Sequence, residues 1–203
     1  MEYKTEQEIF WAGKFGEKYI DRNNSDQLLN SKVALWSQML RSANNIKTIR
    51  ELGCNIGLNL VALKRLQPSL NLFGHEINEE AVKQANNFHV AKITHGSILD
   101  KIDEENVDLT FTSGVLIHIN PDYLKNVYEN LVFGSKRYIL VAEYFNPTPV
   151  QNDYRGNSDK LFKRDFAGDL IDGYGLSLID YGFVYSRDNW SPQDNVTWFL
   201  LEK

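Results

Sequence analysis

The segment 49–59 carries the most informative chemistry in the sequence. It reads IRELGCNIGLN, an apolar run that ends in Glu51 and is followed by Gly53, Asn55 and Gly57. Glycine lets a turn take backbone conformations that are closed to other residues, and it lets a ligand approach without a Cβ in the way. Open α/β sheets bind ligands at the carboxyl ends of their strands. The sequence therefore predicts a small-molecule site at the end of this strand.

A second acid, Glu76, ends the next apolar run, FGHEIN. A carboxylate at the tip of a strand suits a ribose diol, because it can accept hydrogen bonds from two hydroxyls. A nicotinamide enzyme is one alternative, but its fingerprint has three glycines, and Asn55 stands at the middle position here. A strand, turn and helix without any ligand is the other alternative.

The elements that must position these acids follow an alternating order. From residue 46 onward, we expect strands at 46–52, 70–77, 90–94, 107–112 and 138–143, and helices at 58–66, 79–88 and 121–131. This alternation predicts right-handed crossovers and a parallel sheet covered by helices on both faces.

Both ends of the chain depart from the alternation. Apolar residues at helical spacing predict two N-terminal helices, at 4–22 and 26–43. Residues 159–173 are expected to be helical. The apolar runs 176–185 and 196–201 have no helix between them and predict an antiparallel hairpin. We expect one domain over 1–203, with a helical cap at 1–44 and an α/β core at 45–203.

Composition narrows the class of protein. The formal net charge of −5 argues against nucleic-acid binding, which needs a basic surface. The single cysteine, Cys54, cannot form an intramolecular disulfide, and no clustered ligands predict a metal site. No stretch is typical of a signal peptide or a membrane span, so we expect a cytoplasmic protein that does not bind membranes.

The spacing of Glu51 and Gly53 resembles the first motif of the class I S-adenosylmethionine-dependent methyltransferases, acid-x-Gly-x-Gly-x-Gly. The segments HGSILD and FTSGVLIHINP resemble later motifs of that family, in the same order. The resemblance implies a Rossmann-like fold with a seven-stranded, mostly parallel sheet and an antiparallel C-terminal hairpin. It also implies that S-adenosyl-L-methionine is the cofactor. In that family an acid is common where Ser97 stands, and Ile98 would pack on the adenine.

The resemblance assigns the cofactor to a set of residues at the ends of successive strands. These are Glu51, Gly53, Asn55, Gly57, Glu76, Ile77, Gly96, Ser97, Ile98 and Ser113.

The flanking segments EQEIFWAGKFGEKYIDRN, YFNPTPVQNDYRG, LFKRDFAGDL and QDNVTWFLLEK resemble the methylases associated with pseudaminic acid biosynthesis. That resemblance implies an acidic nine-carbon sugar or its nucleotide as the acceptor, methylated on oxygen or nitrogen. A protein or peptide acceptor, or a catalytically silent binding fold, remains an alternative. We expect a monomer or a homodimer.

Aromatic and cationic side chains outside the core could hold such an acceptor by stacking and by pairing with an anion. They are Trp11, Tyr19, Arg22, Tyr154, Arg155 and Arg164. We expect the N-terminal helix and the segment 144–166 to close this pocket. Catalysis is assigned to the edge formed by His118, Glu143 and Tyr144. His118 has a pKa suited to a general base, or it orients its loop.

Overall fold

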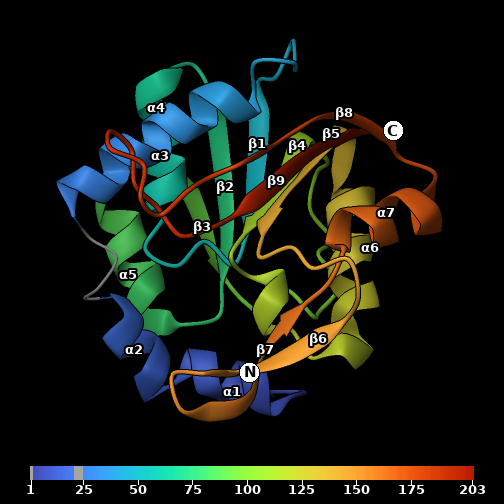
Figure 1. Ribbon diagram of the computed structural model, residues 1–203. Helices are drawn as coiled ribbons and strands as arrows, with labels where there is room; N and C mark the ends of the chain where they lie inside the picture. Colours follow the sequence, from blue (N-terminus) through green and yellow to red (C-terminus); the bar gives the residue numbers. More distant parts are fainter. Residues whose placement is uncertain (1, 21–24) are drawn as a thin grey trace.

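A computed structural model describes residues 2–20 and 25–203 (Figure 1). Its centre is a seven-stranded sheet in the order β3-β2-β1-β4-β5-β9-β8. The strands are β1 (Thr48–Leu52), β2 (Asn71–Glu76), β3 (Lys92–His95), β4 (Val107–Ser113), β5 (Ser135–Glu143), β8 (Ser177–Phe183) and β9 (Thr197–Glu202). Strands β1 to β5 are parallel, and β9 is antiparallel to both of its neighbours. This confirms the predicted mostly parallel sheet with an antiparallel C-terminal hairpin.

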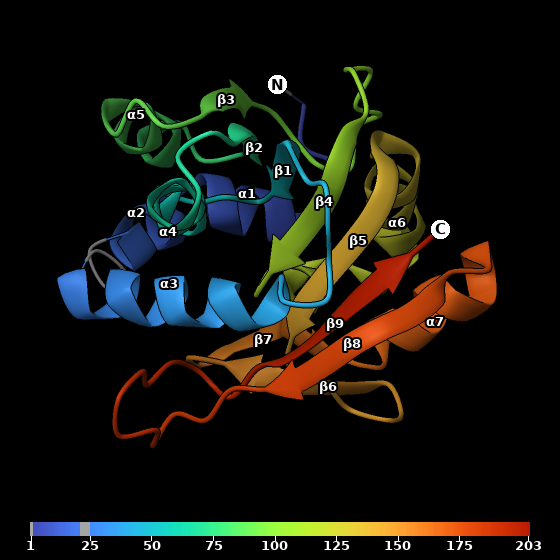
Figure 2. The same cartoon turned by 90° about the horizontal axis from the view of Figure 1, so that it is seen from above.

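Helices cover both faces of the sheet, as Figure 2 shows from above. One face carries α3 (Asp26–Met39), α4 (Leu58–Leu66) and α5 (Glu79–Asn87), and the other carries α6 (Leu124–Gly134) and α7 (Phe166–Tyr174). Two apolar clusters fill the space between the layers, with Trp36 and Phe111 in one and Leu131 and Leu170 in the other. Among the described residues, no helix combines the length and the apolar character that a membrane span requires.

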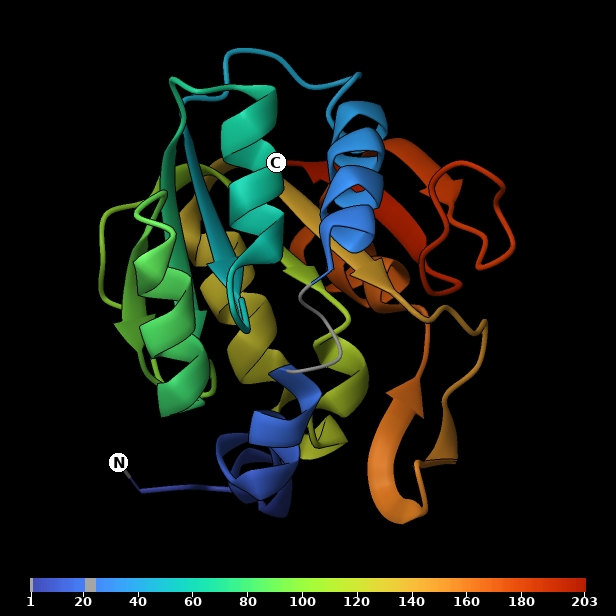
Figure 3. The ribbon, with the colours of Figure 1, turned by 90° about the vertical axis from the view of Figure 1, so that its left-hand side faces the viewer.

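Three smaller structures gather at the carboxyl ends of the parallel strands. Helices α1 (Glu6–Ala12) and α2 (Lys14–Ile20) lie there, beside a separate antiparallel hairpin of β6 (Val150–Tyr154) and β7 (Asn157–Lys163) (Figure 3). Two short 3-10 helices, η1 (Leu116–His118) and η2 (Pro121–Tyr123), follow β4. These elements form the cover of the site described below.

The N-terminal region differs from the prediction of two helices. The expected helix over 4–22 is divided at Gly13, whose extended backbone ends α1, so the described residues contain three helices before β1. Glycine is a poor helix residue because it has the most backbone freedom to lose. Residues 21–24 of the expected helix lie outside the described residues, and α3 ends at Met39 rather than at residue 43.

The expected helix over 159–173 is also wrong in its first half. Strand β7 continues to Lys163, and α7 begins only at Phe166. Asp165 caps that helix, because its carboxylate accepts a hydrogen bond from the Gly168 amide at 2.8 Å. The cap marks the true start of the helix, and the residues before it, up to Lys163, belong to a strand.

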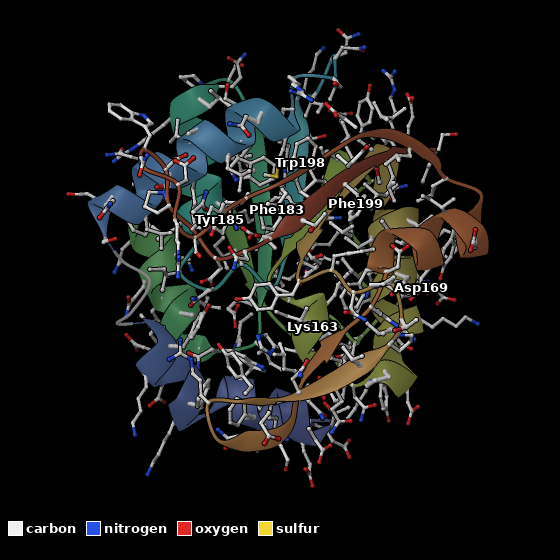
Figure 4. The ribbon with its side chains drawn as sticks, in the orientation of Figure 1. Lys163, Asp169, Phe183, Tyr185, Trp198 and Phe199 are labelled. Carbon is white, nitrogen blue, oxygen red and sulfur yellow. The ribbon has the colours of Figure 1, made fainter. Side chains whose placement is uncertain are left out.

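The outer strand of the sheet carries an exposed aromatic row. Along β8 and its continuation, Tyr181, Phe183 and Tyr185 are 63%, 61% and 49% exposed. In Figure 4, Phe183 lies between Tyr185 and Phe199 of β9, at the front of the molecule. The opposite side of this hairpin is tied to the end of α3, where the Arg41 guanidinium donates two hydrogen bonds to Asp180.

Candidate functional site

A cavity runs across the carboxyl ends of β3, β2, β1 and β4, beneath α1 and α2. Twelve of the predicted site residues line it: Trp11, Tyr19, Glu51, Gly53, Asn55, Glu76, Ile77, Gly96, Ser97, Ile98, Ser113 and His118. The structure therefore brings the predicted cofactor set together, apart from Gly57, which caps the start of α4. Five other predicted site residues are not among the described residues that line the cavity: Glu143, Tyr144, Tyr154, Arg155 and Arg164. Arg22 lies outside the described residues.

Glu51 lines the cavity at the end of β1 and is 1% exposed. Its Oε1 accepts a hydrogen bond from the Asn59 side-chain Nδ2 at 2.6 Å, and Asn59 Oδ1 in turn accepts from Lys32 Nζ at 2.9 Å. No described residue donates to Glu51 Oε2, although that atom is buried. Burial raises the pKa of Glu51, and the nearby Lys32 opposes that shift. An unpaired buried carboxylate oxygen in a cavity is a site for a cationic or hydrogen-bond-donating group of a ligand.

The turn after β1 explains why asparagine can stand between the two glycines. Asn55 has a φ of 48°, within the left-handed region, and Gly53 and Gly57 have φ of 78°. Asparagine tolerates this conformation better than other residues with side chains. The departure from a three-glycine motif therefore leaves the shape of the turn intact.

Glu76, at the end of β2, is tied to this turn. Its Oε2 accepts from the Asn55 amide at 2.7 Å and its Oε1 accepts from the Asn78 amide at 2.8 Å. Burial raises the pKa of Glu76, whereas these backbone donors favour its charged form. The carboxylate thus has a fixed orientation at the cavity wall, with lone pairs remaining for hydroxyl groups.

The end of the cavity at β3 combines apolar side chains with a polar pair. Ile77, Ile98 and Leu99 line it, and the Ser97 hydroxyl donates a hydrogen bond to the Glu8 carboxylate of α1. Glu8 is 6% exposed. Helix α1 therefore supplies a buried acid next to Ser97, the position at which the resemblance leads us to expect an acid.

His118 lines the cavity on the β4 side, on η1. Its Nδ1 lies 2.6 Å from the carbonyl oxygen of Lys160 in β7. A carbonyl can only accept, so Nδ1 carries the proton and donates it, and Nε2 keeps a free lone pair. Burial lowers the pKa of His118 to about 4, so the imidazole is neutral at neutral pH.

Glu143 occupies a different place from the one predicted for a catalytic acid. It is 3% exposed, and its Oε1 accepts from the amides of Val115 and Leu116, both at 3.1 Å. The carboxylate therefore holds the start of η1, the turn that carries His118, without lining the cavity among the described residues. Glu143 is a positioning residue in this geometry.

Burial raises the pKa of Glu143 to about 7, from an ordinary 4.5. Between these pH values the unfolded chain releases this proton and the folded chain keeps it. The free energy of unfolding is therefore expected to fall as the pH rises from 4.5 to 7, by about 3 kcal/mol from this group. Glu143→Gln removes that dependence. Chemical denaturation of both proteins from pH 4.5 to 8 measures the difference, and parallel curves would show that Glu143 is ionised throughout.

An aromatic cluster joins the covering elements to His118. The His118 ring lies 4.6 Å from the Trp11 ring and 4.7 Å from the Tyr154 ring, centroid to centroid. Gln7 of α1 also donates a hydrogen bond to the carbonyl of Asp159 at 2.9 Å. The indole Nε1 of Trp11 is buried and has no acceptor among the described residues. Through these contacts, α1 and the segment 144–166 meet at this end of the cavity.

The two cations predicted in the segment 144–166 do not line the cavity. Arg155 is exposed at the tip of the β6–β7 hairpin, with its guanidinium 5.7 Å from the Tyr154 ring centre. Arg164 forms an ion pair with Asp169 at 3.5 Å. The Tyr144 phenol is near Asp194, and burial together with that charge raises the pKa of Tyr144. Tyr144 and Arg164 therefore already have partners outside the cavity.

Sequence reasoning missed Glu8, Lys32, Asn59 and Asp194. A signal existed for Glu8, because Thr5 and Glu8 have the spacing of a capping box, which the structure contains. That signal predicts a helix start and says nothing of a cavity. Lys32 and Asn59 meet Glu51 through the packing of α3 on α4, which no local pattern shows.

The sequence matches no protein-family model and no curated protein. Its structure is similar to magnesium protoporphyrin IX methyltransferase from Synechocystis PCC 6803 with bound SAM, with a TM-score of 0.70, 12% identity and full coverage of both chains. It is also similar to N-methyltransferase NodS from Bradyrhizobium japonicum WM9 (TM-score 0.64, 12% identity, 92% of this chain and 97% of that one). A third similar structure is the O-methyltransferase from a trans-AT PKS multienzyme of Brevibacillus brevis, with a TM-score of 0.67 and 14% identity. The match covers 100% of this chain and 81% of that one. The chain has the fold of these methyltransferases.

Proposed function

We propose that this protein is an S-adenosylmethionine-dependent methyltransferase that methylates an oxygen or nitrogen of a small acceptor. The observation that carries the proposal is the row of groups across the four strand ends. From β3 to β4 the cavity offers an apolar slot, the fixed Glu76 carboxylate, the unpaired Glu51 oxygen and neutral His118. That order matches a base, a ribose, an amino-acid group and a reacting centre.

The described residues fit the cofactor in their chemistry. Glu51 Oε2 would accept from the ammonium of the methionine part, and Glu76 from the ribose hydroxyls. The bound cofactor supplies a sulfonium methyl, which is already an activated electrophile. The chain then has to hold the acceptor atom in line and remove one proton. His118 Nε2 can accept this proton on its lone pair, and Glu143 holds η1, the turn that carries His118.

Binding is tested first, by calorimetry with S-adenosylmethionine and S-adenosylhomocysteine. We expect dissociation constants in the micromolar range, which correspond to a binding free energy on the order of −8 kcal/mol. NAD is the matched negative control, since a nicotinamide enzyme is the competing interpretation of the turn after β1. Binding of NAD in place of either methionine derivative would overturn the proposal.

Glu76→Gln is expected to weaken S-adenosylmethionine binding by about tenfold or more. The amide keeps an oxygen for one backbone donor but loses the charge, and hydrogen bonds to charged groups are worth about 1.5–3 kcal/mol each. Calorimetry of the variant measures the loss. Lys83→Gln, an exposed change on α5 that breaks only the surface pair with Glu79, controls for general effects. Equal affinity in Glu76→Gln and wild type would remove the ribose role.

We propose a small acceptor rather than a protein, and an acidic nonulosonic sugar or its nucleotide as its class. The cover formed by α1, α2 and the β6–β7 hairpin supports a small molecule, because Trp11 and Tyr19 line the cavity and Tyr154 packs on His118 behind it. The resemblance of the flanking segments supports the sugar class. Arg155, on the exposed hairpin tip, is a cation that could bind an acceptor carboxylate.

The acceptor is tested by incubating nonulosonic acid intermediates with the protein and S-adenosylmethionine. Mass spectrometry is expected to show the gain of one methyl group in place of a hydrogen. Arg155→Ala should then raise the KM for the acceptor while the cofactor affinity stays unchanged. Methylation of neutral sugars at the same rate would contradict the acidic class.

A further inference from the structure

The cavity end at β3 has features of a slot for one particular nucleobase. Ile77, Ile98 and Leu99 give it apolar walls suited to a flat ring. The carboxylate of Glu8, which also lines the cavity, is its acidic group. This acid comes from α1, almost ninety positions earlier in the chain than Ser97, its partner.

Counting lone pairs shows that Glu8 can accept one more hydrogen bond. Its Oε2 accepts from the amides of Lys4 and Thr5, which occupies both lone pairs of that oxygen. Its Oε1 accepts only from the Ser97 hydroxyl among the described residues. One acceptor position therefore remains on Oε1. The Ser97 hydroxyl is itself engaged, because it also accepts from the Leu99 amide at 3.0 Å.

An ionised carboxylate accepts hydrogen bonds and cannot donate them. At the edge of a base it therefore suits an exocyclic amino group, as in adenine, and opposes a carbonyl oxygen at the same place. Burial makes the opposition strong, since the unfavourable pair has no water to separate it.

We propose that Glu8 reads the 6-amino group of adenine and so makes the site selective for adenosine over its 6-oxo counterpart. This inference rests on the proposed function. The acid that recognises the base then comes from α1, because the loop after β3 carries Ser97 and not an acid at the corresponding position.

The assignment has a consequence for the cover of the site. Helix α1 is fixed by Glu8 at one end and, at the other, by the Asn78 side chain, which donates to the carbonyls of Trp11 and Ala12 at 3.1 and 3.3 Å. The same helix presents Trp11 to His118. A base bound to Glu8 adds a further contact to α1, so binding of the nucleotide stabilises the wall that the acceptor meets.

The test compares S-adenosylhomocysteine with S-inosylhomocysteine, which differs by an oxygen in place of the 6-amino group. In calorimetry the wild type is expected to prefer the adenine compound by tenfold or more. Glu8→Gln should reduce that preference to threefold or less, because its amide can turn to donate to the 6-oxo group. Hydrogen exchange of α1 should slow on adding S-adenosylhomocysteine to the wild type and much less in Glu8→Gln.

Thr5→Ala is the matched control. It removes the hydroxyl that accepts from the Glu8 amide at 3.1 Å and weakens the start of α1, but it keeps the carboxylate. Both ligands should bind it more weakly by the same factor, so the preference is retained. If Glu8→Gln keeps the full preference, or if the wild type binds both compounds equally, Glu8 does not read the base although the methyltransferase proposal stands. If the wild type binds neither compound, the proposed function is wrong and this inference is wrong with it.

Discussion

Gly53→Ala is expected to abolish measurable S-adenosylmethionine binding, a loss of at least about a hundredfold, or more than ~2.7 kcal/mol. A Cβ at Gly53 would lie 2.8 Å from Cγ2 and 2.9 Å from Cγ1 of Val115, and the backbone there has a φ of 78°. Either the turn after β1 or the loop after β4 must then move. Both segments line the cavity, Gly53 on the turn after β1 and Val115 on the loop after β4. Calorimetry measures the affinity.

The control for backbone strain is Gly175→Ala. Gly175 has a φ of 66°, ends α7 outside the cavity lining, and has open space where a Cβ would be placed. A left-handed alanine costs roughly 1–2 kcal/mol at either position, so Gly175→Ala shows the effect of this strain without the contact with Val115. Only Gly53→Ala should lose the ligand. If both bind as the wild type does, the turn after β1 is not the cofactor site.

His118→Asn is expected to lower kcat for a hydroxyl acceptor by about 10²–10⁴-fold, the usual contribution of a general base. The asparagine amide can still donate to the Lys160 carbonyl, as Nδ1 does at 2.6 Å, but it has no counterpart to the basic Nε2. Because burial lowers the pKa of His118 to about 4, protonation of this residue should lower the wild-type kcat/KM only below about pH 5. Steady-state kinetics across pH measure both effects.

Two further measurements separate a base from a merely structural residue. The affinity for S-adenosylhomocysteine should be unchanged in His118→Asn. The unfolded chain binds a proton at His118 near pH 6.5 and the folded chain only near 4, so the wild type should lose stability as the pH falls through this window. The variant should lack that loss. If its kcat equals that of the wild type, His118 only orients its loop or the acceptor needs no base.

The central sheet could be predicted because its signals are local. The apolar runs, the glycines after Glu51 and the position of Pro121 mark strands and helix starts within a few residues of the chain. The carboxyl ends of parallel strands necessarily share one edge, so Glu51 and Glu76 had to meet. Asn55 was the one doubtful position, and its left-handed backbone resolves the doubt.

The cover of the site could not be predicted in the same way. Strand β7 is mostly polar and half exposed, so its pattern has neither clear alternation nor a helical stripe. The partnership of Glu8 with Ser97 and that of Glu143 with η1 arise from tertiary packing between distant segments. Glu143 was correctly placed at the end of its strand, but the direction of its side chain depends on the amides of Val115 and Leu116.

The acceptor for the His118 proton is a main-chain carbonyl, and this limits how the site can evolve. Any residue at position 160 presents the same oxygen, so substitutions of Lys160 leave the tautomer of His118 unchanged. An insertion or deletion within the β6–β7 hairpin, by contrast, would shift the carbonyl along the strand and turn it to the other side. Position 160 is therefore free to vary in composition, whereas the hairpin is constrained in length.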